Sequence, residues 1–203
     1  MQPEQSIVYM VDDDARIRES LTALLSSMGR NIVAFASAAE YLQFSRPALP
    51  ACLVLDLDMP EMTGLELQQQ LADQEGPPIV FLTGRGDIPS TVKAIKAGAV
   101  EFLSNPCDEE ELIQAIDAAI KADGQARLKY AELSELRKRY ASLTPRERDV
   151  LPFVVSGLLN KQTAGELGKS EITIRIHRGQ IMRKMAADSL ADLVRMAARL
   201  GIP

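Results

Sequence analysis

The sequence has 203 residues, of which 46% are hydrophobic, a formal net charge of −5, one histidine and two cysteines. No apolar run approaches the roughly 18 residues that a membrane-spanning helix needs, which excludes a membrane-spanning protein. The start of the chain lacks the basic and apolar regions of a secretory signal, so we expect the protein to stay in the reducing cytoplasm.

The net charge averages over unlike segments. Residues 1–122 carry 8 basic and 19 acidic side chains, a net of −11, residues 123–140 a net of +2, and residues 141–203 a net of +4. A basic segment attached to an acidic one favours a nucleic-acid-binding module joined to a partner domain. We therefore expect three parts: a first domain over 1–122, a linker over 123–141 and a second domain over 142–203.

Short apolar runs alternate with amphipathic stretches in the first domain. The runs predict strands at Ile7–Val11, Ile32–Phe35, Cys52–Leu55, Ile79–Leu82 and Phe102–Leu103. The stretches predict helices at about 15–28, 38–45, 64–74, 90–97 and 109–122. Repeated strand-helix units imply an α/β fold with a five-stranded parallel sheet, whose ligands bind beyond the carboxyl ends of the strands.

Acidic residues follow two of these strands. Asp12, Asp13 and Asp14 end the first, and Asp56 and Asp58 end the third. Converging carboxylates repel one another unless a cation neutralises them, and oxygen ligands suit Mg²⁺ or Mn²⁺. We expect Asp14 to be a helix N-cap instead, because short polar side chains favour helix starts.

The strand ends carry a resemblance to a known family. The order Y-M-V-D-D-D, C-L-V-L-D-L-D-M-P-E-M-T-G, I-V-F-L-T-G-R-G-D and A-G-A-V-E-F-L-S-N-P-C resembles the flavodoxin-like receiver domain of two-component response regulators, and is most similar to the FixJ-like branch. The resemblance implies that Asp56 accepts a phosphoryl group from the phosphohistidine of a sensor histidine kinase. It further implies that Asp12, Asp13, Asp56 and the main-chain carbonyl of Asp58 hold the metal.

The resemblance also implies a switch, in which Thr83 donates its hydroxyl to the phosphoryl group and Phe102 turns inward when Thr83 moves. The family places a lysine where this chain has Asn105, before Pro106. Asparagine carries no charge, and charge-assisted hydrogen bonds are about twice as strong as neutral ones. Arg85, Lys93 or Lys96 are alternative sources of that charge, a pairing of Asp58 with Arg85 stays open, and the Asn105–Pro106 bond is a candidate for the cis form.

Residues 125–141 contain neither glycine nor proline and space leucines as a helix does, so we expect a helical linker, with a flexible linker as the alternative. In the last segment, Thr144, Pro145 and Glu147 predict a capped helix that runs to about Ser156. Pro152 predicts a kink or break inside it. Further helices are expected at Lys161–Leu167, at about 171–186 after Ser170, and from Ser189 or Asp188 through Leu200.

The helix over 171–186 has two unlike faces at 100° per residue. Ile174, Ile181 and Met185 fall on the side expected to face the core. The other side is expected to be exposed, and it carries Ile172, Arg175, Ile176, Gly179 and Arg183. Arginine reads guanine in the major groove and apolar groups contact thymine methyls, so this face suits a DNA-recognition helix, with a merely solvated face as the alternative.

The stretches L-T-P-R-E-R-D-V-L, N-K-Q-T-A-G-E-L-G-K-S and T-I-R-I-H-R-G-Q-I-M-R-K-M resemble the small all-α helix-turn-helix domain of the LuxR/NarL type. The resemblance implies DNA contacts from Lys161, Thr173, Arg175, Ile176, Arg178, Gly179, Arg183 and Lys184. Gly179 departs from the longer side chain often found there. The last helix is implied to mediate dimerisation through Leu190, Leu193, Val194 and Ala197, with completion of the core as the alternative.

Together these observations predict a transcription factor rather than an enzyme. Phosphorylation of Asp56 is expected to promote a homodimer that binds inverted-repeat DNA half-sites. One alternative is a receiver that works largely without phosphorylation because of Asn105. Another is a phosphatase of the haloacid dehalogenase type, since Leu55-Asp56-Leu57-Asp58 resembles its motif, although Pro60 departs from that pattern.

Overall fold

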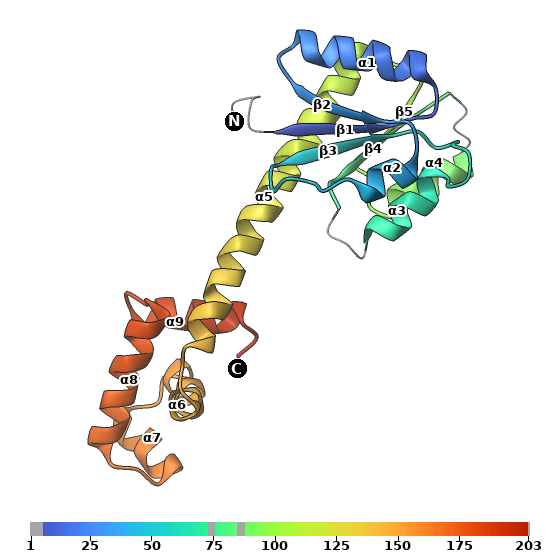
Figure 1. The fold of residues 1–203 in the computed structure, drawn as a ribbon. Coiled ribbons are helices and arrows are strands. Elements are labelled where there is room, and N and C mark those ends of the chain that lie inside the picture. Colours follow the sequence, from blue (N-terminus) through green and yellow to red (C-terminus); the bar gives the residue numbers. More distant parts are fainter. Residues whose placement is uncertain (1–5, 73–75, 85–87, 203) are drawn as a thin grey trace. The chain divides into compact units, whose positions relative to one another are not determined.

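The computed structural model describes residues 6–72, 76–84 and 88–202, and the chain divides into two compact units, Met1–Arg127 and Leu128–Pro203 (Figure 1). The first unit holds β1 (Ile7–Val11), α1 (Ala15–Ser27), β2 (Asn31–Phe35), α2 (Ala38–Gln43), β3 (Ala51–Leu55), α3 (Gly64–Ala72), β4 (Ile79–Thr83), α4 (Ile88–Lys96), β5 (Glu101–Ser104) and the first part of α5 (Glu109–Ala141). The second holds the end of α5, α6 (Pro145–Val155), α7 (Asn160–Leu167), α8 (Glu171–Met185) and α9 (Leu190–Arg199).

The five strands form one parallel sheet in the order β2-β1-β3-β4-β5. This is the flavodoxin-like order, so the predicted α/β fold is confirmed. Each predicted strand is present, and none of its ends differs from the prediction by more than one residue. The carboxyl ends of β1, β3 and β4 therefore lie at one edge of the sheet, where the acidic residues were expected.

Alternating residues of the strands face two separate hydrophobic cores. Tyr9, Leu53 and Phe81 pack on the side covered by α2, α3 and α4, whereas Val8 and Val80 pack on the side covered by α1 and α5 (Figure 1). The strands β1, β3 and β4 are buried throughout, which explains why they are apolar without alternation. Because both faces of the sheet are packed against helices, the carboxyl edge of the sheet is rigid, and rigid elements position the side chains of a site well.

Helix α5 is continuous from the first unit into the second. It runs from Glu109 to Ala141, through Gly124, so the prediction of a helix over 125–141 is confirmed. Asp123 on this helix is 6% exposed, and its carboxylate accepts a hydrogen bond from the Ala51 main-chain N–H at 2.8 Å and from Arg127 at 2.6 Å. These bonds fix α5 to the start of β3. None of the helices in the described part of the chain is of the length and apolar character that a membrane crossing needs.

The second unit is a small helical domain with its own core. The predicted helix starts are confirmed, because the side chains of Thr144, Ser170 and Ser189 each accept a main-chain hydrogen bond at the start of α6, α8 and α9. Gly168 ends α7 in the left-handed region, at φ 61°. Pro152 was expected to kink or break the helix; α6 continues through it, so there is no break. The adjacent Leu151 and Val154 are each 1% exposed, and this packing compensates for the hydrogen bond that proline cannot make.

Thr163 in α7 is a buried polar residue whose replacement we expect to stabilise the second unit. It is fully buried, and among the described residues its hydroxyl has no hydrogen-bond partner. A buried, unsatisfied polar group costs about 1–3 kcal/mol. Thr163→Val, which keeps the shape, is therefore expected to raise the free energy of unfolding by about 1 kcal/mol in a denaturant titration. A loss of stability would contradict this account of the Thr163 hydroxyl.

Candidate phosphoacceptor site and nucleic-acid interface

Three carboxylates meet at the carboxyl edge of the sheet. Asp12 and Asp13 follow β1, Asp56 follows β3, and one oxygen from each lies within 4.8 Å of the others. The main chain places them: the Asp56 N–H donates to the Val11 carbonyl at 2.9 Å, and the Asp12 N–H donates to the Phe35 carbonyl at 3.3 Å. The acids that the sequence singled out are therefore brought together.

Burial and mutual repulsion shape the electrostatics of this cluster. Asp12 is 3% exposed, and burial raises its pKa to about 6, with Asp56 and Asp13 adding repulsion. Burial also raises the pKa of Asp56, and the carboxylates of Asp13 and Asp58 raise it further. A site of this kind favours a bound cation, because a cation stabilises the ionised form of each group.

The first unit is therefore expected to lose stability as pH rises in the absence of divalent metal. Asp12 has a higher pKa folded, about 6, than unfolded, about 4, so its favourable contribution is present below about pH 4 and lost as pH rises through 6. We expect thermal unfolding in a chelator to show about 1–3 kcal/mol lower stability at pH 7.5 than at pH 4.5 from this group. Asp12→Asn is expected to flatten the dependence, and an unchanged slope in that variant would contradict the assignment.

Thr83 and Phe102, the two residues of the expected switch, lie on the neighbouring strands β4 and β5. Thr83 ends β4, is 1% exposed, and its side chain hydrogen-bonds to the Asp56 carboxylate. The half-buried Phe102 packs against the core, with its ring centroid 5.8 Å from that of Phe81. The Asn105 N–H donates to the Thr83 carbonyl at 2.8 Å, and the Asn105–Pro106 bond is cis.

Two arginines contact the rim of the cluster, and the sequence interpretation missed both. Asp14 caps α1, as expected, and its carboxylate pairs with Arg16 at 2.7 Å. Arg18 donates to the main-chain carbonyl of Asp12 at 2.7 Å. Lys93 and Lys96 are exposed in the last turn of α4. Arg85 lies outside the described residues. Its two predicted roles, as a source of the charge that the family's lysine provides and as a partner of Asp58, therefore stay predictions.

Gly64, at the start of α3, is a further residue that the sequence interpretation missed. A Cβ atom built on it would overlap the main-chain carbonyl oxygen of Asp56 and lie 2.9 Å from Cε1 of Phe81. Its N–H donates to the Leu57 carbonyl at 2.9 Å. Only glycine allows α3 to pack this closely against the residue that carries the candidate phosphoacceptor. Many helices begin near a glycine that makes no close contact, so the sequence around Gly64 does not indicate that it packs against Asp56.

In the second unit, α8 has the two faces that its sequence predicts. Ile174, Ile181 and Met185 are fully buried. Ile172 and Ile176 are 62% and 57% exposed, and the opposite face also exposes Arg175, Gly179 and Arg183. Of the other predicted DNA contacts, Lys161 is exposed at the start of α7, Thr173 is half-buried in the first turn of α8, and Arg178 lies 3.5 Å from the Asn160 side chain.

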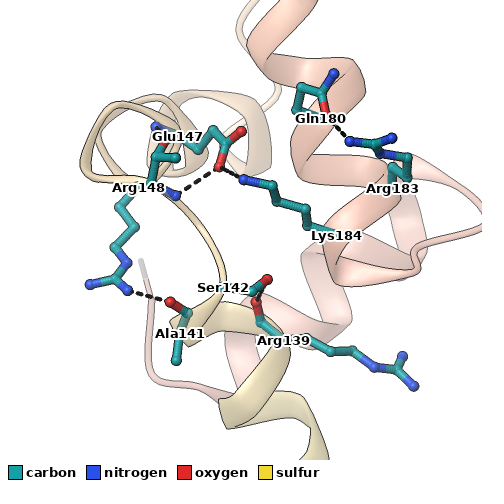
Figure 2. A network of polar contacts seen from close by, with 9 residues as sticks. Arg139, Ala141, Ser142, Glu147, Arg148, Gln180, Arg183 and Lys184 are labelled. Atoms are coloured by element: carbon teal, nitrogen blue, oxygen red, sulfur yellow. Dashed lines mark hydrogen bonds and ion pairs between the residues drawn. The ribbon is translucent and has the colours of Figure 1, made fainter.

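Lys184, one of the predicted DNA contacts, forms an ion pair within the domain. Its ammonium group is bonded at 2.7 Å to the Glu147 carboxylate, which is 95% buried and also accepts from the Thr144 N–H (Figure 2). Burial alone would raise the pKa of Glu147, but the hydrogen bonds from Lys184 and Thr144 outweigh it and hold the pKa below its usual value. Lys184 thus joins α8 to the capping box of α6, because a buried carboxylate needs a cation near it.

Figure 2 shows that the same region ties the end of α5 to α6. Arg148 donates to the Ala141 carbonyl at 2.8 Å, and its guanidinium lies 5.2 Å from the Tyr140 ring centroid.

The four predicted dimer contacts on α9 differ in how much of each side chain is exposed to a partner. Leu193 and Ala197 are 0% and 1% exposed inside the core, whereas Leu190 and Val194 are 36% and 38% exposed. Leu190 and Val194 are therefore the two that are available to a partner.

Comparison with known families decides the class of protein. Residues 8–117 match the family described as the response regulator receiver domain, and residues 141–197 match the family described as bacterial regulatory proteins of the luxR family. The chain is a response regulator with a LuxR-type DNA-binding domain. With a luxR-family domain and a relative named as a transcriptional regulatory protein, the chain is a transcription regulator rather than an enzyme, and the phosphatase alternative is rejected.

Full-length relatives share both domains of this response regulator. Nodulation protein W of Bradyrhizobium diazoefficiens is 48% identical over 98% of this chain and 88% of its own length. Response regulator protein TodT of Pseudomonas putida is 48% identical over 98% of this chain and 88% of its own length. Transcriptional regulatory protein FixJ of B. diazoefficiens is 40% identical over 96% of each chain.

Solved structures agree with this assignment. The response regulator StyR matches with a TM-score of 0.87 and 45% identity, over 96% of this chain and 99% of that one. Full-length FixJ from B. japonicum matches with a TM-score of 0.56 and 39% identity, over 97% of this chain and 98% of that one. The predicted resemblance to the FixJ-like branch is confirmed.

Proposed function

We propose that this response regulator receives a phosphoryl group on Asp56 from a sensor histidine kinase and thereby changes its dimerisation and DNA binding. The observation that carries the proposal is the convergence of Asp12, Asp13 and Asp56 within 4.8 Å, with the Thr83 side chain hydrogen-bonded to Asp56. Asp56 is half-buried, so its carboxylate is held in place and still reached from the edge of the sheet. In-line attack on a phosphoryl group requires that fixed position.

The acidic cluster fits Mg²⁺ or Mn²⁺. The residues that would hold the metal are Asp12, Asp13 and Asp56, with the main-chain carbonyl of Asp58, because clustered oxygens are the ligands these ions prefer. When bound, the ion supplies positive charge that stabilises the equatorial oxygens of the transferred phosphoryl group. Thr83 donates its hydroxyl to one of those oxygens, and Asn105 offers a neutral amide where the family has a lysine.

The output in this proposal is binding to double-stranded DNA with inverted-repeat half-sites. Helix α8 enters the major groove, since its exposed face presents both arginine and isoleucine. The contacts come from Lys161, Thr173, Arg175, Ile176, Arg178, Gly179 and Arg183. Leu190 and Val194 on α9 contact the second protomer. The change around Thr83 and Phe102 shifts the population of the dimer, because the two receiver states differ in affinity.

The parts of the chain have distinct roles in this proposal. Residues 1–122 form the phosphoacceptor domain, residues 123–141 a helical linker, and residues 142–203 the DNA-binding domain, and the protein acts in the cytoplasm. The continuous helix from Glu109 to Ala141 supports the helical linker. Asn105 favours a second candidate, namely a receiver that regulates transcription largely without phosphorylation, since one charge-assisted bond to the phosphoryl group is missing.

Phosphorylation is tested by treating the full chain with a small-molecule phosphodonor and Mg²⁺ and measuring the intact mass over time. We expect one phosphoryl group per chain, none in Asp56→Asn, and faster labelling in Asn105→Lys, because the lysine restores the missing charge. Labelling of Asp56→Asn at the rate of the natural sequence would contradict the assignment of Asp56. Absence of labelling in both the natural chain and Asn105→Lys would favour the phosphorylation-independent candidate.

A further inference from the structure

Gly179 lies in the interior of α8, where glycine is unfavourable for the free protein. A Cβ atom at this position would meet no atom of the described residues within 4 Å, and Gly179 is exposed. An interior helical glycine costs roughly 0.5–1 kcal/mol relative to alanine, because it loses more backbone freedom on folding. Nothing in the packing of the isolated domain therefore favours glycine over alanine here.

The neighbours of Gly179 are also unfavourable for a surface that only meets water. Ile172 and Ile176 precede it on the same face of the helix and are 62% and 57% exposed. Arg183 follows it one turn later, so the face reads isoleucine, isoleucine, glycine, arginine along the helix. On this face the helix surface is lowest at Gly179, which has no side chain, and the exposed isoleucine side chains lie beside that low point.

The interior glycine and the exposed isoleucines are both favourable if this face of α8 packs against another molecule. Resting on the proposed DNA-binding function, we infer that Gly179 is the point where the main chain of α8 approaches the floor of the major groove most closely. The missing side chain lets the helix seat more deeply, and this brings Ile176 against the C5-methyl group of a thymine. The contact is apolar, so it adds specificity without adding a phosphate contact.

Gly165 in α7 provides a matched control. It is also an exposed glycine inside a helix of the same domain, and a Cβ atom there would lie more than 4 Å from every atom that the structure describes outside its own helix turn. Alanine at either position is expected to stabilise its helix to a similar extent. The two substitutions therefore share their effect on folding and differ only in the surface they alter.

The experiment uses the full chain with a phosphoryl mimic and Mg²⁺. Its probes are a duplex that the natural chain selects from a random-sequence pool and a scrambled duplex of the same composition. We expect Gly179→Ala and Gly165→Ala both to raise the thermal midpoint of the DNA-binding domain. Gly179→Ala is expected to weaken binding to the selected duplex about tenfold, with no change for the scrambled duplex and no change in salt dependence. Gly165→Ala is expected to bind both duplexes as the natural chain does.

A second arm replaces thymines of the selected duplex one at a time by deoxyuridine, which removes only the methyl group. At one position per half-site, the natural chain is expected to lose more affinity than Gly179→Ala does, because the deeper seating is required for the contact. Equal binding of the selected duplex by Gly179→Ala and Gly165→Ala would overturn the inference. A natural chain that binds selected and scrambled duplexes equally would overturn the proposed DNA-binding function itself, and the inference with it.

Discussion

Gly64→Ala is expected to destabilise the receiver domain by about 3 kcal/mol and to slow phosphorylation of Asp56 about 100-fold. The added methyl group would overlap the Asp56 carbonyl oxygen and crowd the Phe81 ring, so either α3 or the loop after β3 must move. Displacing the Asp56 main chain also displaces its carboxylate from Asp12 and Asp13. The two effects are measured by denaturant titration and by the rate of labelling with a phosphodonor.

Gly84→Ala is the matched control at the same edge of the sheet. Among the described residues, the nearest atom to a Cβ atom at Gly84 would be the Asn105 carbonyl oxygen at 3.9 Å, which is an ordinary contact. We expect this variant to keep the stability of the natural chain. Normal stability and labelling of Gly64→Ala would show that the loop after β3 does not depend on the close approach of α3.

Glu147→Ala is expected to destabilise the DNA-binding domain by about 3 kcal/mol, seen as an earlier unfolding transition of that domain in a denaturant titration. The substitution removes the capping box of α6 and leaves the ammonium group of Lys184, whose side chain is 25% exposed, without its carboxylate partner. Loss of a cap costs about 1 kcal/mol, and breaking a largely buried ion pair costs more than an exposed one.

Asp149→Ala on the same helix serves as the control for Glu147→Ala. Asp149 pairs with Arg146 at 3.5 Å, but both side chains are more than half exposed, so the pair contributes little. We expect its loss to change the free energy of unfolding by less than about 0.5 kcal/mol. Equal effects of the two substitutions would contradict the structural role given to the bond between Glu147 and Lys184.

The receiver fold and its acidic cluster were predictable because local signals and topology agree there. Apolar strands buried on both faces stand out in the sequence, and a parallel sheet brings their carboxyl ends to one edge. This reasoning placed Asp12, Asp13, Asp56 and Thr83 at a shared edge. The caps of α6, α8 and α9 were predictable for the same reason, because Thr144, Ser170 and Ser189 act on main-chain groups close to them in sequence.

What escaped prediction depends on contacts between elements that are distant in sequence. The pairing of Lys184 with Glu147 needs α8 to pack on α6, and the closeness of Gly64 to Asp56 needs the exact path of α3. The resemblance implied dimer contacts from both Leu190 and Leu193 on α9, but only packing shows that Leu193 is buried and Leu190 is exposed. Pro152 does not break α6, because the local cost of proline is outweighed by burial of its neighbours.

The affinity of the full chain for its selected duplex, with and without a phosphoryl mimic and Mg²⁺, tests the central claim most directly. The account predicts that the mimic raises both the dimer fraction and the DNA affinity, and that Asp56→Asn abolishes both changes, because the mimic acts through the acidic cluster. Unchanged dimer fraction and affinity with the mimic bound at Asp56 would contradict a phosphorylation-dependent switch.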